Sequence, residues 1–192
     1  MSLVERVKSI LLKPKETWPV IAAESADAAS IYSRYLVILA AIPAIASFIG
    51  LTLVGVGGFG VSYRVPIGMG LTQMVVRYVV SLVMVFVMAL VVDALAPNFG
   101  GTKNQVQALK LVAYSCTAAF VGGIFGIIPS LAILSLLASI YSIYLLYTGI
   151  SVLMRCPAEK AAVYTAVVIV AVIVIGVVFS ALMAMVSPMP RV

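Results

Sequence analysis

Long stretches of this chain contain no charged residue, and their lengths indicate helices that cross a membrane. A spanning helix needs about 20 mostly apolar residues, because each residue rises about 1.5 Å through roughly 30 Å of hydrocarbon. One such stretch lies between Arg34 and Arg64, and a second ends at Asp93. The uncharged stretch from 111 to 154 is long enough for two helices, with the turn expected at Pro129 because proline lacks a backbone donor. A last apolar run completes five predicted spans, at about residues 35–59, 74–96, 106–128, 131–153 and 161–187.

The composition indicates that the protein uses lipid as its solvent. The chain is 64% hydrophobic and only 9% charged, whereas about a quarter of a typical globular protein is charged. Too few polar side chains remain to cover a surface that faces water. We therefore expect an all-α, polytopic transmembrane helical bundle. Its predicted parts are a cytoplasmic and interfacial segment at 1–34, a five-helix domain at 35–187 and a tail at 188–192.

The basic residues are distributed unevenly between the two sides of this predicted bundle. Loops rich in lysine and arginine are retained in the cytoplasm, so their positions indicate orientation. If the N-terminus is inside, the basic residues left outside are Arg64, Arg77 and Arg191. The basic residues inside are then Arg6, Lys8, Lys13, Lys15, Arg34, Lys103, Lys110, Arg155 and Lys160. We predict a cytoplasmic N-terminus and a C-terminus on the outside.

The first residues predict a short amphipathic helix at the inner membrane interface. Ser2 and Glu5 match a capping box, and Pro14 is expected to end the helix. Apolar residues recur at helical spacing at Leu3, Val4, Val7, Ile10 and Leu11. The basic residues Arg6, Lys8 and Lys13 lie away from that face, so we expect them to point away from the lipid.

Two side chains are candidates for anchoring the protein at the lipid interfaces. Trp18 carries an indole that suits the interface, because its ring is apolar and its N–H can stay hydrated. The alternative for this segment, Thr17-Trp18-Pro19, is docking of a partner. Arg77 lies near the outer end of the second span, where its long side chain can reach the outer headgroups.

The third span presents a surface of small residues. Small side chains let helix backbones approach closely, so we expect this span to be central in the bundle. The same surface could instead join two copies of the chain, since the spacing does not specify the partner. The predicted packing residues are Ser115, Ala118, Gly122 and Gly126.

Asp93 is the strongest candidate for a functional charge, because it lies close to the inner end of the second span. A carboxylate there needs a cation, a hydrogen-bond donor or water. We expect Lys110 and Asn98 to be its partners, and a proton or cation site is the alternative. Between them, Gly100-Gly101 permits a tight turn, and Thr102 with Gln105 matches a capping box.

Hydroxyl groups form a row along one face of the fourth span, because helical spacing brings Tyr141, Tyr144 and Thr148 together. They could line a solute route or form hydrogen bonds between helices. The full candidate polar or ion site comprises Asp93, Asn98, Lys110, Tyr114, Tyr141, Tyr144 and Thr148. The charges at the inner surface could equally be the ordinary collar of positive residues.

Several classes of chemistry lack the residues they need. The chain has no histidine and only six acids, and we find neither paired carboxylates nor a Gly-x-Ser-x-Gly turn, so we expect no catalytic residue, metal or cofactor. No basic face with stacking aromatics is present, which argues against nucleic acid. Cys116 lies in the third span and Cys156 in a predicted cytoplasmic loop, where thiols stay reduced.

Three stretches occur in a characteristic order along the chain. They run from Lys13-Pro14 through Thr17-Trp18 and Ile21 to Glu24, from Asn98-Phe99-Gly100-Gly101 through Gln105 to Ala113-Tyr114-Ser115, and from Ile140-Tyr141-Ser142 through Gly149, Met154, Pro157 and Lys160-Ala161 to Tyr164. Together they resemble the bacterial branch of the Yip domain family, proteins named for Ypt/Rab interaction. The similarity covers about residues 10–185. It implies five spans and a cytoplasmic N-terminus.

The resemblance implies a non-enzymatic protein of a bacterial inner membrane. Eukaryotic relatives act in vesicle budding and membrane shaping, so we expect a scaffold or membrane-organising interaction protein. The alternative is a small transporter or ion-coupled permease that uses Asp93 and the hydroxyls of the fourth span. The expected partners are the lipid bilayer, a second copy of the chain, or a membrane or cytoplasmic protein not identified by the sequence.

Overall fold

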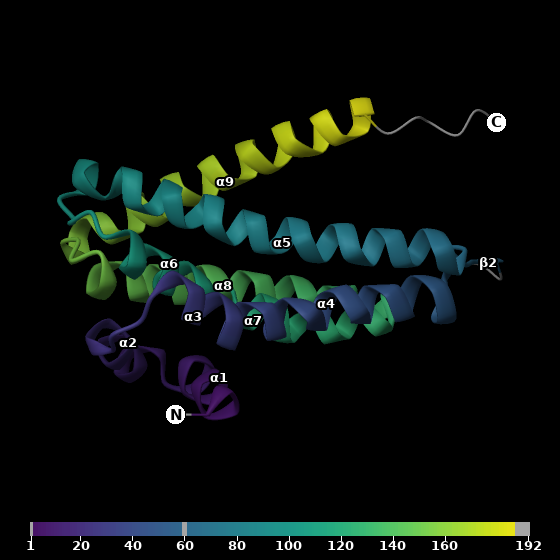
Figure 1. Ribbon diagram of the computed structural model, residues 1–192, viewed down its shortest axis with the longest axis horizontal. Coiled ribbons are helices and arrows are strands. Elements are labelled where there is room, and N and C mark those ends of the chain that lie inside the picture. Colours follow the sequence, from purple (N-terminus) through teal and green to yellow (C-terminus); the bar gives the residue numbers. More distant parts are fainter. Residues whose placement is uncertain (1, 59–60, 187–192) are drawn as a thin grey trace.

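The computed structural model describes residues 2–58 and 61–186, which form a bundle of helices (Figure 1). Among these residues, five segments are long and apolar enough to cross a membrane. They run through Ala28–Val54, Ile67–Phe99, Gln105–Ile127, Ala132–Leu153 and Ala158–Val178. The predicted helical, multi-span architecture is therefore confirmed. The predicted tail and the last residue of the fifth span lie outside the described residues.

The first span is assembled from several helical pieces. It is preceded by α1 (Leu3–Leu12) and α2 (Pro14–Ala23), and it consists of α3 (Ala28–Ile31), a π-helical turn η1 (Tyr32–Leu36), α4 (Val37–Ile49) and a second π-helical turn η2 (Gly50–Val54). The span begins before the predicted residue 35, so Arg34 lies inside the helix. It ends at Gly55, whose φ of 87° is a backbone conformation that glycine adopts most easily.

The two strands are a small departure from the predicted all-α fold. They are β1 (Val56–Gly58) and β2 (Val61–Tyr63), paired antiparallel between the first and second spans. Gly57 and Gly58 lie in the first of these strands. The second span follows as α5 (Ile67–Leu95) and a 3-10 turn η3 (Ala96–Phe99).

The third span is central but not continuous. It consists of α6 (Gln105–Ser115), α7 (Thr117–Gly122) and a 3-10 turn η4 (Gly123–Ile127). Within it, 61% of the most apolar window is buried, against 22–33% in the other spans. This burial agrees with the expected central position. The helix is capped by Asn104, whose side chain accepts a hydrogen bond from Gln107 N at 3.0 Å, and not by Thr102 as predicted.

The last two spans complete the bundle. A 3-10 turn η5 (Pro129–Leu131) precedes α8 (Ala132–Leu153), and α9 (Ala158–Val186) follows a short loop. Figure 1 shows α9 beginning at the same end of the bundle where α5 finishes, and then diverging from α5 toward its C-terminus. Helices α1 and α2 form a helical hairpin that lies against the flank of the bundle near that same end. This end is called the hairpin end below, after α1 and α2 and not after the two strands.

Close approaches between helices depend on glycines. A Cβ atom added at Gly122 would lie 2.2 Å from Cβ of Ala138 in α8, and one at Gly50 would lie 2.1 Å from the carbonyl oxygen of Gly126. A Cβ atom at Gly126 itself would meet its nearest neighbour at 3.8 Å. The small-residue surface of the third span therefore packs against other spans of the same chain. Joining of two copies through it stays a prediction.

Candidate functional site

The N-terminal helices α1 and α2 form a hairpin that is fastened to the bundle by side-chain hydrogen bonds. Trp18 Nε1 donates to Thr148 Oγ1 at 3.1 Å, and Tyr141 Oη donates to the carbonyl oxygen of Leu11 at 2.7 Å. Lys110 Nζ donates to the carbonyl oxygen of Ile21 at 3.0 Å and also to that of Glu24. These donors belong to α2, α8 and α6, so the hairpin is an integral layer of the structure.

The position of Trp18 corrects the expectation of an interfacial anchor. Its side chain is fully buried. A Cβ atom at Gly149 would come within 2.6 Å of Trp18 Cε2, so α8 has a glycine where the indole ring packs. The sequence shows that Trp18 has an apolar ring and a polar N–H, but it does not show whether lipid or protein surrounds them. Here the ring fills the space between α2 and α8, and Thr148 accepts the N–H that water would otherwise have satisfied.

Lys110 and Asp93 do not form the expected ion pair. Lys110 is 2% exposed, and its ammonium group binds the carbonyl groups at the end of α2. These carbonyls carry the partial negative charge of a helix C-terminus, which favours a cation. Lys110 therefore holds the hairpin to the third span. The sequence could not reveal this partner, because Ile21 and Glu24 act through their backbone atoms.

Asp93 has one oxygen without a visible donor. Its Oδ1 is buried, and no described residue donates a hydrogen bond to it. Asn98, the other expected partner, is exposed in the turn η3. Asp93 lines none of four well-formed cavities between the described residues.

The hydroxyl row of the fourth span has a structural use at two of its three positions. Tyr141 and Thr148 hold the hairpin, and Thr148 Oγ1 also donates to the carbonyl oxygen of Leu145 at 3.0 Å. Tyr144 is 41% exposed, and its ring lies 5.5 Å from that of Tyr141. None of the three lines any of the four cavities. Of the two uses weighed for this row, hydrogen bonding between helices is the one observed.

The residues of the family resemblance meet at the hairpin end of the bundle. The ring of Phe99 stacks on that of Tyr164 with centroids 4.7 Å apart, and Tyr164 Oη donates to the carbonyl oxygen of Val92. A Cβ atom at Gly101 would lie 2.8 Å from the carbonyl oxygen of Met154. The loop after the second span and the loop between the fourth and fifth spans therefore pack against each other through contacts that require these residue types.

Cys156 lies in the loop between the fourth and fifth spans. Its thiol donates to the carbonyl oxygen of Phe99 at 3.3 Å, and the residue is 4% exposed. Burial raises the pKa of the Cys156 thiol, and Lys160 partly opposes this effect. Cys156 therefore contributes to packing and carries little thiolate at neutral pH.

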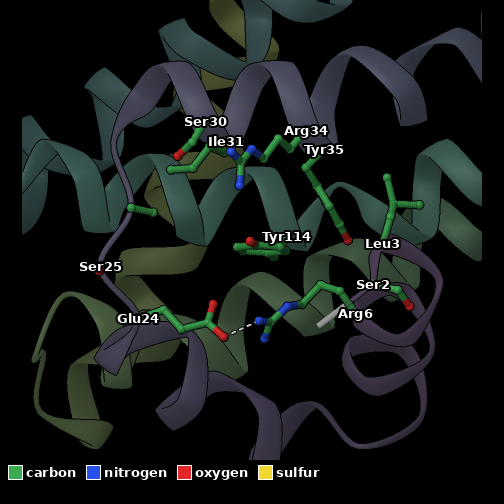
Figure 2. Close-up of a pocket in the computed structure, with 11 residues that line it drawn as sticks. Ser2, Leu3, Arg6, Glu24, Ser25, Ser30, Ile31, Arg34, Tyr35 and Tyr114 are labelled. Carbon is green, nitrogen blue, oxygen red and sulfur yellow. Dashed lines mark hydrogen bonds and ion pairs between the residues drawn. The ribbon is translucent and has the colours of Figure 1, made fainter.

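A cavity of about 450 Å³ lies between α1, the α2–α3 connection, the start of the first span and α6. Figure 2 shows Arg34 reaching into it from the first span and Arg6 from α1, with the Tyr114 ring drawn between them. The cavity is lined by Ser2, Leu3, Arg6, Glu24, Ser25, Ala26, Ser30, Ile31, Arg34, Tyr35 and Tyr114. We call it the arginine cavity.

Arg6 is the buried charge of this cavity and lies inside the protein, a position that the expectation of a side chain pointing away from the lipid did not specify. The residue is 7% exposed, and its Nη2 forms an ion pair with Glu24. Its Cζ lies 5.7 Å from the centroid of the Tyr114 ring. Nη1 is buried and has no hydrogen-bond acceptor among the described residues. The helical pattern does not indicate this burial, because the partner of Arg6 lies at the end of another helix.

Arg34 differs from Arg6 in being exposed. It forms no hydrogen bond or ion pair of its own with a described side chain. The nearby Asp27 caps α3, where its Oδ1 accepts from Ser30 N at 3.3 Å. This capping, led by the side chain of Ser30, lowers the pKa of Asp27, and the positive charge of Arg34 adds a smaller effect.

Two tyrosines of the cavity lining, Tyr35 and Tyr114, are held in place by contacts with their neighbours. Tyr35 shares a hydrogen bond of 2.7 Å with Thr117, and both residues are buried. The rings of Tyr35 and Tyr114 lie 4.6 Å apart. Tyr114 is a residue of the predicted polar site, and its hydroxyl makes no hydrogen bond to a described residue.

Arg77 lines a second cavity of about 360 Å³. This cavity is lined by Ala40, Pro43, Ala44, Ser47, Arg77, Ser81 and Gly123. The Arg77 side chain is exposed there. Its role as an anchor for outer headgroups stays a prediction.

Comparison with known proteins agrees with these observations. A family model described as the Yip1 domain matches residues 8–180. Inner membrane protein YohC of Escherichia coli strain K12 is 26% identical over 161 residues, which cover 82% of this chain and 83% of that protein. YohC of E. coli O6:H1 strain CFT073 matches to the same extent. No solved structure matches this chain.

Proposed function

The chain belongs to the Yip1 domain family of integral membrane proteins, and on that basis we propose that it is a non-enzymatic scaffold or interaction protein of a bacterial inner membrane. The inner-membrane location rests on the likeness to YohC. The N-terminal hairpin lies in the cytoplasm or against the inner leaflet in this proposal, and the C-terminus lies outside.

One observation carries the scaffold proposal. Polar side chains of α6 and α8 fasten the hairpin, as Lys110, Tyr141 and Thr148 demonstrate. A solute pathway would need such groups to face an open space between the spans. Their use in hydrogen bonds is what a rigid platform requires, because each fully satisfied polar contact fixes the hairpin in one position.

The outer face of the hairpin is the surface we assign to partner contact. Val4 and Leu12 of α1 are 59% and 77% exposed, and Lys8 beside them is exposed as well. A mixed apolar and basic surface suits the headgroup region of the inner leaflet or a partner that lies there.

A second candidate is an ion-coupled permease, which the unpartnered Oδ1 of Asp93 favours. An ionisable group near the inner end of a span that lacks a donor is the kind of group that exchanges protons or binds cations. The same protein preparation can discriminate the two proposals.

The test combines a flux measurement with crosslinking in membranes. Purified protein in liposomes with a pH or sodium gradient should give no flux above that of empty liposomes. A photo-crosslinker at Lys8 should give a discrete protein adduct in native membranes, and the same group at Val170, an exposed residue of α9, should not. Flux that Asp93→Asn abolishes would establish the permease instead. A chain that shows neither flux nor an adduct at Lys8 would contradict the scaffold proposal.

A further inference from the structure

The arginine cavity contains donors that the protein itself does not use. Arg6 is buried, yet its Nη1 has no acceptor among the described residues. A buried donor without an acceptor costs free energy, so such an atom marks a place where another group supplies one. Arg6 also lines a cavity of about 450 Å³, which is large enough to hold a small polar group.

Further donors line the same space. Arg34 is exposed, and Figure 2 shows its guanidinium directed into the cavity. The Tyr114 hydroxyl makes no hydrogen bond to a described residue, and Ser2 Oγ accepts from Glu5 N at 3.3 Å, which leaves its O–H to donate. Two residues with guanidinium groups and two with hydroxyl groups therefore line one cavity, and they come from α1 with its N-cap, the first span and α6.

The charges near the cavity favour an anion. Arg6, Arg34 and Lys110 are the cations of this region, and Glu24 and Asp27 are the carboxylates. Glu24 is engaged by Arg6, and Asp27 caps α3. Arg34 is thus left without a counter-ion in direct contact among the described residues.

We propose that the arginine cavity binds a phosphate group, held by Arg6 and Arg34 with the hydroxyls of Tyr114 and Ser2. Guanidinium groups match the geometry of phosphate oxygens and form strong charge-assisted hydrogen bonds with them. This site does not depend on the scaffold function. Binding there would tie α1 to the first span and to α6.

The surroundings favour an anionic lipid headgroup as the source of the phosphate. The cavity opens at the beginning of the first span, because Ser25 and Ala26 precede that span and Ser30 lies in its first turn. Leu3 and Ile31 give the lining an apolar part as well. Headgroup phosphates lie at the depth where spanning helices begin, and acyl chains contact apolar residues beside them.

Binding is measured on the full-length protein in mild detergent by native mass spectrometry and by the shift of thermal unfolding. The probes are phosphatidylglycerol, phosphatidylcholine as the lipid without net charge, and inorganic phosphate. Arg34→Gln is the principal variant, because an exposed side chain without a partner can be changed with little effect on folding. Arg155→Gln is the matched control, since Arg155 is also exposed and is predicted to lie on the same side of the membrane.

Phosphatidylglycerol should bind the wild type and Arg155→Gln equally, and it should bind Arg34→Gln about tenfold more weakly. Arg6→Lys keeps a positive charge opposite Glu24 but removes the guanidinium, so it should also bind about tenfold more weakly while remaining folded. Tighter binding of inorganic phosphate, with the same dependence on Arg34, would support the site with a soluble ligand. Equal binding by Arg34→Gln and Arg155→Gln, or binding of phosphatidylcholine as tight as that of phosphatidylglycerol, would overturn the proposal.

Discussion

At the scale of single residues, the charged groups of this protein find partners that the sequence pattern does not indicate. Lys110 binds two backbone carbonyls at the end of α2, and Arg6 binds Glu24 on the far side of the hairpin. The sequence marks both Lys110 and Tyr114 as candidate polar residues, and both lie in α6. It misassigns the partner of Lys110, because positions on different helices become neighbours only through packing.

The free energy of unfolding should distinguish the roles of Lys110 and Asp93. Lys110→Met loses two charge-assisted hydrogen bonds and leaves the Ile21 carbonyl buried without a donor, so it should destabilise the protein by about 2 kcal/mol or more. Asp93→Asn should change stability by less than about 1 kcal/mol, since no described donor binds its Oδ1. Unfolding in mixed micelles measures both values.

The double variant completes the comparison. Residues that share no partner give additive effects, within about 0.5 kcal/mol. A coupling energy clearly above that value would mean that Asp93 and Lys110 interact in the folded protein, contrary to the hydrogen bonds seen here.

At the scale of helices, the uncharged stretches predict that there are spans and roughly where they lie. They do not predict where a helix begins, ends or is interrupted. Hydrophobic length follows from the thickness of the membrane, so the third and fourth spans lie close to their predicted positions. The second span begins at Ile67, well before the predicted residue 74. The early start of the first span is decided by the cap at Asp27, and its end by the positive φ of Gly55. Both are local backbone features that hydrophobicity does not report.

Docking of the hairpin on α8 depends on Gly149. Gly149→Ala should destabilise the protein by about 1–3 kcal/mol, because the new Cβ would come within 2.6 Å of both Leu111 Cδ1 and Trp18 Cε2. Gly176→Ala in α9 is the control, since nothing lies within 4 Å of a Cβ added there. It should be neutral or slightly stabilising, as alanine favours a helix.

Two readouts separate a displaced hairpin from a general loss of stability. Thermal unfolding in detergent reports overall stability, and trypsin cleavage after the exposed Lys15 reports release of the hairpin. Gly149→Ala should be cleaved faster than the wild type at a temperature where both remain folded. Equal cleavage of Gly149→Ala and Gly176→Ala would show that the hairpin tolerates a side chain at this position.

At the scale of the whole molecule, polar contacts are concentrated at one end of the bundle. The arginine cavity, the Lys110 contacts and the loops joined through Phe99 and Met154 all lie at the hairpin end. The sequence indicates this concentration through its excess of basic residues on one side. It does not indicate the cavity, because Arg6, Arg34 and Tyr114 come from three distant parts of the chain.

Membrane topology provides the test at this scale. Five spans place the two termini on opposite sides, and nine of the twelve basic residues fall on the side of the N-terminus. A reporter that is active only outside the cytoplasm should therefore be active when fused after Val192 and inactive when inserted between Gly101 and Asn104. A cytoplasmic reporter at the same two positions should give the reverse result, which controls for expression. Activity of one reporter at both positions would contradict the five-span arrangement. An inverted result would keep five spans but place the arginine cavity at the outer leaflet, where basic residues are not attracted by the anionic lipids of the cytoplasmic face.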